Sequence, residues 1–142
     1  YIENDPLAVL QAVLSEGYDS VLVDSFAEIA VAVVDHHGGT MKNAETKILN
    51  LLEKHNQAEN RNKVNTSFML IQQVTKGGEF AGSNRFKHML TGMAHMKFDS
   101  EGGRAIHFSK NRRGGEMNKL FFSLDTANHV GWLFTQPLNM VI

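Results

Sequence analysis

The sequence predicts an α/β fold: a mostly parallel sheet with helices on both faces, extended by antiparallel strands toward the C-terminus. Two observations predict it. In the first half of the chain, helical segments alternate with short continuous apolar runs, the pattern of strands buried in a parallel sheet. In the second half, strand-like segments follow one another around a glycine turn, which indicates antiparallel hairpins. The 142 residues contain no internal repeat, so a single domain over 1–142 is predicted.

The elements of the first half begin with a helix that Asp5 is predicted to cap, with Pro6 at its first position. The apolar run 21–23 then predicts a buried strand. The pattern of residues 26–34 fits a helix or a strand equally well. Residues 35–40 have the composition of a loop because they combine polar residues with two glycines.

The next elements are a longer helix over 41–56, capped by Thr40, and a second buried strand over 67–71. A short helix is predicted over 86–93. Three strands close the chain, and a hairpin turn at Gly102-Gly103 separates the first two. The predicted strands are 95–98, 105–109 and 119–124.

Composition excludes several classes of protein. Fourteen basic residues oppose fifteen acidic ones, so the net charge of −1 gives no overall positive field, and any DNA contact must come from a local patch. Without cysteine the chain has neither disulfides nor thiolate metal sites, which fits a cytoplasmic protein. No apolar stretch approaches the ~18 residues that a membrane span needs.

The seven histidines are dispersed, and His36-His37 is the only close pair. Adjacent side chains point apart on most backbones, and no cluster of carboxylates stands near the pair in the sequence at the spacing of metal ligands. A structural zinc site is therefore not predicted.

Polar residues at a strand end are the first candidate site. Asp24 and Ser25 follow the predicted strand 21–23, and α/β sheets hold their ligands at the carboxyl ends of strands. From the strand pattern alone, Asp24 could hold a metal ion or cap the following turn. Gln73, at the end of the second buried strand, is a phosphate-bonding amide or an ordinary polar strand end.

Two further segments have the residue types of a nucleic-acid contact. In the glycine-rich loop 75–84 and just after it, cations offer charge to phosphates, glycines let the backbone approach them, and an aromatic ring could stack on a base. These residues are Lys76, Gly77, Gly78, Phe80, Gly82 and Arg85. Lys110, Arg112 and Arg113 form a basic turn after a predicted strand. The alternatives are a flexible surface loop without a partner and a solvated basic turn.

Three segments, in order, carry a family resemblance: VLVDS (21–25), IQQVTKGGEFAGSNRFKHML (71–90) and FSKNRRGG (108–115). Together they resemble the RecA/RadA family of recombinases and the related hexameric, DnaB-type helicases, with the RadA branch closest. The resemblance covers almost the whole chain and implies a RecA-like core. In that family, the position of segment 39–45, with Lys42, is that of the first DNA-facing loop.

The resemblance implies roles for the candidate residues. Asp24 would hold the Mg²⁺ of ATP with Ser25 beside it, and Gln73 would sense the γ-phosphate. The loop 75–84 would be the second DNA-binding loop, a contact with single-stranded DNA. Lys110 and Arg112 would reach the nucleotide of a neighbouring subunit, which implies a head-to-tail ring or filament.

The sequence also departs from the family pattern. Gln73 stands where the RadA pattern has His, Ser83-Asn84 replaces Gly-Pro, and Arg113 replaces Phe. No G-x-x-x-x-G-K-[ST] phosphate loop occurs in the chain. We therefore expect the N-terminal part of the core, with its phosphate loop and catalytic Glu, to be missing, as the start at Tyr1 also suggests.

Three functions fit these observations. The first is the DNA-binding part of a DNA-dependent ATPase that acts in recombination, repair or replication and does not hydrolyse ATP alone. The second is a non-catalytic module that binds DNA or a partner protein and has lost the phosphate loop. The third is a domain that keeps only the fold.

Overall fold

A computed structural model of the chain describes residues 5–59, 61–74, 82–98, 102–114, 119–125 and 130–134. For residues 123–125 and 130–134 it describes the backbone alone. The chain divides into two compact units, Tyr1–Met89 and Leu90–Ile142, and each is considered by itself. Whether 1–142 acts as one domain, as the sequence predicts, stays a prediction.

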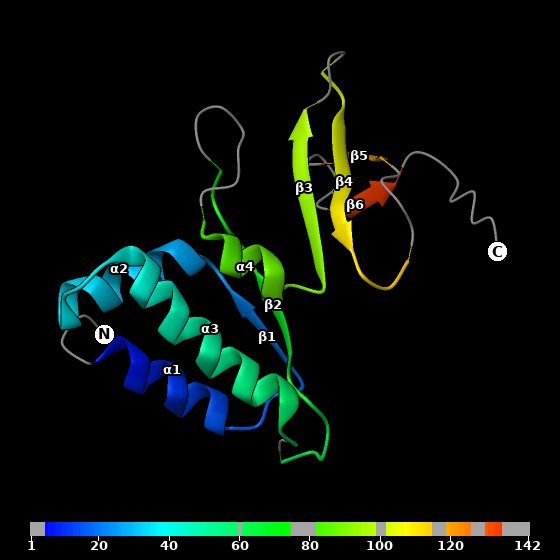
Figure 1. The fold of residues 1–142 in the computed structure, drawn as a ribbon. Helices are drawn as coiled ribbons and strands as arrows, with labels where there is room; N and C mark the ends of the chain where they lie inside the picture. The colour runs from blue at the N-terminus through cyan, green and yellow to red at the C-terminus, as the bar shows by residue number, and fades with distance from the viewer. Residues whose placement is uncertain are drawn as a thin grey trace. The chain divides into compact units, whose positions relative to one another are not determined.

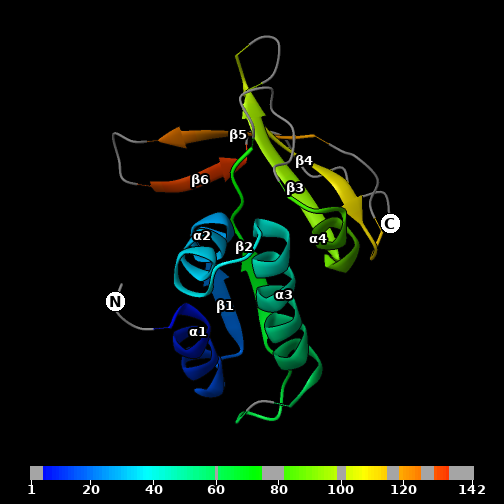
Figure 2. The same ribbon diagram turned by 60° about the vertical axis from the view of Figure 1, so that its left-hand side comes forward.

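The first unit is a mixed α/β unit with a two-stranded parallel sheet. Strands β1 and β2 pair in the register that joins Val23 to Leu70. Helices α1, α2 and α3 lie on one face of this strand pair (Figures 1 and 2). The elements are α1 (Pro6–Ser15), β1 (Ser20–Val23), α2 (Phe26–His37), α3 (Met41–Gln57), β2 (Ser67–Leu70) and α4 (Asn84–Met89).

Side-chain caps set where the helices begin. The Asp5 carboxylate accepts from Leu7 N at 2.9 Å, and Pro6 occupies the first position of α1. The Thr40 hydroxyl accepts from Asn43 N at 3.3 Å at the start of α3. Helix α2 ends at Gly38, whose φ of 71° lies in the left-handed region that favours glycine.

The core of the first unit lies between the helices and the strand pair. Helix α3 places a stripe of apolar residues at helical spacing against it, including the fully buried Ile48. The rings of Phe26 in α2 and Phe86 in α4 meet edge to face, with centroids 4.6 Å apart, and both are almost completely buried. This contact fastens the short helix α4 to the rest of the unit.

The other face of the strand pair is exposed. Leu22 and Met69, which are partners in the register, are 61 % and 68 % exposed. Strands of parallel sheets are usually covered on both faces. Within the described residues, the prediction of helices on both faces is therefore wrong for this unit, because the three long helices share one face.

The second unit is an antiparallel sheet with the strand order β3-β4-β5-β6. Ala105 and Phe122 are its buried apolar residues among those described. A register shift between Met93 and Ala94 interrupts the pairing of the first two strands. The strands are β3 (Gly92–Phe98), β4 (Arg104–Asn111), β5 (Leu120–Asp125) and β6 (Val130–Phe134).

The α/β class and the change from parallel to antiparallel strands are confirmed. The prediction of one extended sheet is wrong for the described strands, because the parallel and antiparallel strands form two separate sheets. A sequence shows which segments are strands, but pairing between distant strands depends on contacts that local patterns do not contain.

Two local predictions are also wrong. Residues 35–37 continue α2 instead of forming a loop, because the glycine that stops the helix is Gly38. The short helix predicted over 86–93 is α4, which ends at Met89, and β3 begins at Gly92. No described helix has both the length and the apolar character needed to cross a membrane.

The buried aromatic contact makes a stability prediction. Phe86→Ala should lower the free energy of unfolding of the first unit by about 3–5 kcal/mol, because it removes a buried ring and leaves a cavity. Urea unfolding followed by circular dichroism at the helix band measures this, since all described helices lie in the first unit. His88→Ala, an exposed change on the same helix, should stay within about 0.5 kcal/mol. Equal effects of the two changes would contradict the assigned core.

Candidate functional site

The carboxyl ends of the two parallel strands are joined by backbone hydrogen bonds. Ile71 N donates to Val23 O, and Phe26 N donates to Ile71 O, both at 2.9 Å. The residues that follow β1 therefore run beside those that follow β2. This brings Asp24 and Gln73 to the same edge of the strand pair, as the sequence predicts for strand ends, and both side chains are exposed.

Asp24 and Ser25 have different surroundings. The Ser25 side chain is buried, and its hydroxyl accepts from Glu28 N at 3.4 Å as the cap of α2. Asp24 is exposed. Among the described residues, no two histidine or carboxylate side chains lie close enough to Asp24 to form a three-ligand metal site with it.

These surroundings do not fit a free-standing Mg²⁺–ATP site. Among the described residues, the strand edge offers one exposed carboxylate, that of Asp24. Mg²⁺ in nucleotide sites takes most of its ligands from waters and phosphates that the protein must hold in place. Asp24 could contribute one ligand to such a site. No step of ATP hydrolysis can be assigned to the described residues.

The glycine-rich loop lies mostly outside the described residues. Lys76, Gly77, Gly78 and Phe80 belong to that part. Gly82 is exposed, and Arg85 extends from α4 to donate from Nη2 to Asn50 Oδ1 in α3 at 2.5 Å.

The end of this loop is fastened to α3 by a buried carboxylate. Ser83 N donates to Glu45 Oε2 at 3.2 Å, and the Ser83 hydroxyl accepts from Phe86 N at 3.3 Å. Glu45 is only 8 % exposed. Since Glu45 ends the segment 39–45, this bond connects the two segments that the sequence predicts to face DNA.

Sequence reasoning missed the role of Glu45. The signal was an acidic residue inside the apolar stripe of α3, next to Ala44 and one turn before Ile48 and Leu49. A carboxylate at such a position needs a hydrogen-bond donor, because burying a charge without a partner is costly.

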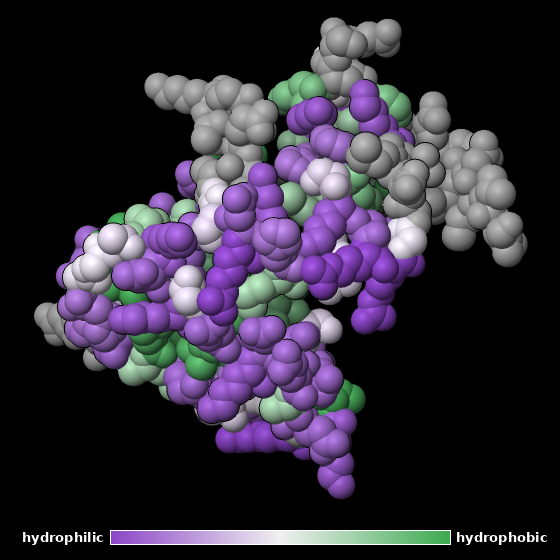
Figure 3. Space-filling view, viewed as in Figure 1, coloured by the Kyte–Doolittle hydropathy of each residue, from purple (hydrophilic) through white to green (hydrophobic). Residues whose placement is uncertain are grey.

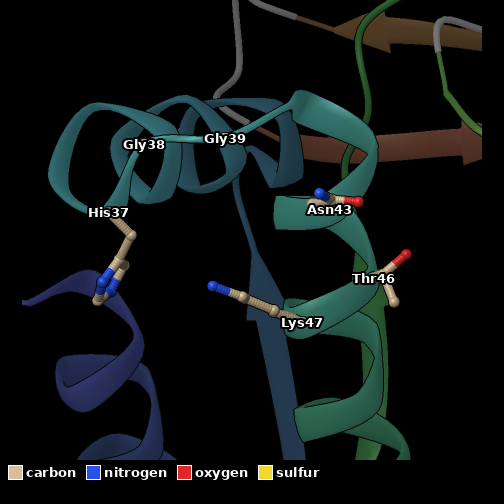
Figure 4. A pocket seen from close by; sticks show the side chains of 6 residues that line it. All are labelled: His37, Gly38, Gly39, Asn43, Thr46 and Lys47. Carbon is tan, nitrogen blue, oxygen red and sulfur yellow. The ribbon is translucent and has the colours of Figure 1, made fainter.

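A hollow of about 420 Å³ opens at the turn between α2 and α3 (Figure 4). The Lys47 side chain extends from α3 toward the side of the hollow where His37 lies. Lys42, which the sequence predicts to contact DNA, is exposed in the first turn of α3 and is not part of this lining. The hollow is lined by His37, Gly38, Gly39, Asn43, Thr46 and Lys47.

The basic turn of the second unit follows the pairing of β3 with β4. Arg112 N donates to Thr91 O at 2.9 Å, and Arg113 N donates to Asn111 Oδ1 at 3.0 Å. Burial and the Arg112 charge lower the pKa of Lys110. This turn belongs to the second unit and Asp24 to the first.

A histidine pair on β3 and β4 was not predicted. The rings of His95 and His107 stack with centroids 5.0 Å apart, and His95 Nε2 lies 2.7 Å from Ser109 Oγ. His107 Nδ1 is buried and has no hydrogen-bond partner within the described part of the chain. Burial lowers the pKa of His107, and the charges of Lys97, His95 and Lys119 lower it further.

Comparison of the chain with models of protein families, with curated proteins and with solved structures found no match. The functional interpretation therefore depends on the residues and the geometry described above.

The Glu45 bond can be tested by hydrogen exchange. In Glu45→Ala the Ser83 amide should exchange at least about tenfold faster, because a hydrogen bond to a charged acceptor contributes roughly 1.5–3 kcal/mol. Glu45→Gln keeps an acceptor oxygen and should show a smaller change. The Ile71 amide, bonded to Val23 O, is the internal control. Unchanged Ser83 exchange in Glu45→Ala would show that the bond does not hold the loop.

The lowered pKa of His107 predicts how stability depends on pH. The folded protein binds this proton less readily than the unfolded chain, whose histidine pKa is about 6.5. The free energy of unfolding that the neutral His107 maintains is therefore fully present above about pH 6.5, and it is lost as the pH falls through the pKa of His107 in the folded protein. An NMR titration of the His107 ring should give a midpoint below 6.5. Lys97→Gln should raise that midpoint, because the Lys97 charge is one cause of the lowered pKa. A wild-type midpoint at or above 6.5 would contradict the lowered pKa of His107.

Proposed function

We propose that this chain is the DNA-binding part of a RecA/RadA-like, DNA-dependent ATPase that acts in recombination, repair or replication. By itself the chain would bind single-stranded DNA and would not hydrolyse ATP. The observation that supports this most is the bond from Ser83 N to Glu45, because it joins the two segments that the family resemblance assigns to DNA.

The charges near this bond also support a contact with DNA. In residues 41–49 the charged side chains are the exposed Lys42 and Lys47 and the buried Glu45. Helix α4 carries Arg85 and Lys87 and no acidic residue. Burial of the one carboxylate leaves the exposed charges of these two stretches positive, and a local basic patch is what a chain with a net charge of −1 needs for binding phosphates.

The strand edge supports the nucleotide part of the proposal. Asp24 and Gln73 are exposed at the ends of neighbouring parallel strands, where α/β proteins place their ligands. A Gln amide can donate to a phosphate oxygen, and Asp24 can offer one ligand to Mg²⁺. Groups that cradle the triphosphate would have to come from outside this chain.

In the same proposal, Lys110 and Arg112 act on the nucleotide of a neighbouring subunit in a head-to-tail ring or filament. Lys110 lies near the end of β4, and Arg112 follows the strand, where the backbone is held by the bond from Arg112 N to Thr91 O. Such a role requires subunits that stack in one direction.

Fluorescence anisotropy with a labelled single-stranded oligonucleotide tests the DNA contact. We expect binding that weakens with salt, which gives a negative slope of log K against log salt. In Lys42→Ala or Lys76→Ala, each lost phosphate contact should make this slope less steep by about 0.7. Lys54→Ala is the matched control, since Lys54 is exposed near the opposite end of α3 from Lys42. Absence of binding at low salt would reject DNA binding by this chain.

A second arm of the experiment repeats the titration with MgATP. A change in DNA affinity that Asp24→Ala or Gln73→Ala removes would support nucleotide sensing at the strand edge. Binding that is insensitive to MgATP would instead favour a DNA-binding module without nucleotide sensing.

A further inference from the structure

Asp5, His36 and His37 form a cluster on the surface of the first unit. Asp5 precedes α1, and the two histidines end α2. His37 Nε2 lies 2.8 Å from Asp5 Oδ1, and the rings of His36 and His37 meet edge to face with centroids 4.7 Å apart. One nitrogen or oxygen atom from each residue lies within 4.8 Å of the other two. The fold thus brings Asp5, which is distant in the sequence, beside the histidine pair.

These three side chains have the donor types of a transition-metal site. Imidazole nitrogens and carboxylate oxygens bind Zn²⁺ at about 2.0–2.2 Å, usually in a tetrahedron. Two ligands of such a tetrahedron lie roughly 3.3 Å apart, a distance that follows from these bond lengths. The atoms of Asp5 and His37 are already closer than this, and no separation in the cluster exceeds it by more than about 1.5 Å. Small side-chain rotations would bring all three into position.

We propose that Asp5, His36 and His37 bind one divalent transition-metal ion, with Zn²⁺ as the best match. Two imidazoles and one carboxylate are also the donor set of several open zinc sites, in which water takes the fourth position. This proposal is independent of the DNA contact proposed above, since none of the three residues takes part in it.

The charges around the cluster of Asp5, His36 and His37 are compatible with a bound divalent cation. Hydrogen bonds from His37 and from Leu7 N lower the pKa of Asp5 against the opposing effect of its burial, so its carboxylate is charged at neutral pH. Lys47 lines the same hollow as His37 (Figure 4), but this ammonium is exposed, and solvent screens the repulsion between exposed charges.

Binding would connect parts of the chain that are distant in sequence. Asp5 and His37 are separated by 32 positions, so an ion between them would link the start of α1 to the end of α2. An ion that binds the folded unit and not the unfolded chain stabilises the fold in proportion to the logarithm of its concentration. Protons compete with a metal ion for imidazole and carboxylate ligands, so binding should weaken as the pH falls.

Titration of the whole chain with ZnCl₂ and CoCl₂ tests the proposal. Calorimetry with Zn²⁺ should give one equivalent of binding at neutral pH, and Co²⁺ should produce the visible absorption of a tetrahedral site. Asp5→Asn, His36→Gln and His37→Gln should each weaken binding by at least about tenfold, as expected when a ligand is lost. Asn is as good a helix cap as Asp, so Asp5→Asn removes the charge while α1 keeps its start.

Other histidines serve as controls. His88→Gln alters an exposed histidine of α4, and His95→Gln alters the stacked pair of the second unit; both should bind Zn²⁺ as the wild type does. Circular dichroism of each variant shows whether the helices are intact. No Zn²⁺ binding by the wild type, or wild-type binding by the variant that combines all three ligand changes, would overturn the proposal.

Discussion

The pairing of β1 with β2 is the constraint on which the first unit depends. Two helices separate these strands in sequence, and the strands still lie in parallel register from Ser20 to Val23. The pairing continues past the strand ends, where Ile71 bonds to both Val23 and Phe26. Because Phe26 is the first residue of α2, the same bonds set where that helix leaves the sheet. The direction of α2 in turn places its last two residues, His36 and His37, beside the cap of α1.

Helix α3 holds the core of the first unit and the start of α4 together. Its apolar stripe packs into the core, and Glu45 is the buried charged residue within that stripe. A buried carboxylate usually lowers stability unless it is bonded, and here its partner is the backbone N–H of Ser83. The bond sets the point where the glycine-rich loop rejoins the fold and α4 begins. Packing of Phe86 against Phe26 then holds α4 from its buried side.

Local signals in the sequence predicted most of the elements, and long-range pairing accounts for what they missed. Asp5-Pro6 and Thr40 mark helix starts by side-chain chemistry, which acts over three residues. His36 and His37 were assigned to a loop because polar residues before two glycines resemble one, although only Gly38 stops the helix. The division into two sheets and the cluster with Asp5 depend on contacts across tens of residues. No local pattern contains that information.

The distribution of charge between buried and exposed positions bears directly on the function of a nearly neutral chain. Counting residues gives a net charge of −1, which suggests no affinity for a polyanion. Glu45, however, is withdrawn from the surface and bonded to Ser83, while Lys42, Lys47 and Arg85 remain exposed. In Figure 3 hydrophilic residues cover most of the outer side of α3, consistent with these exposed positions. A phosphate that approaches α3 meets the exposed Lys42 and Lys47, and the acidic residue between them in the sequence, Glu45, is buried. The local field, and not the net charge, therefore decides whether a nucleic acid can bind here.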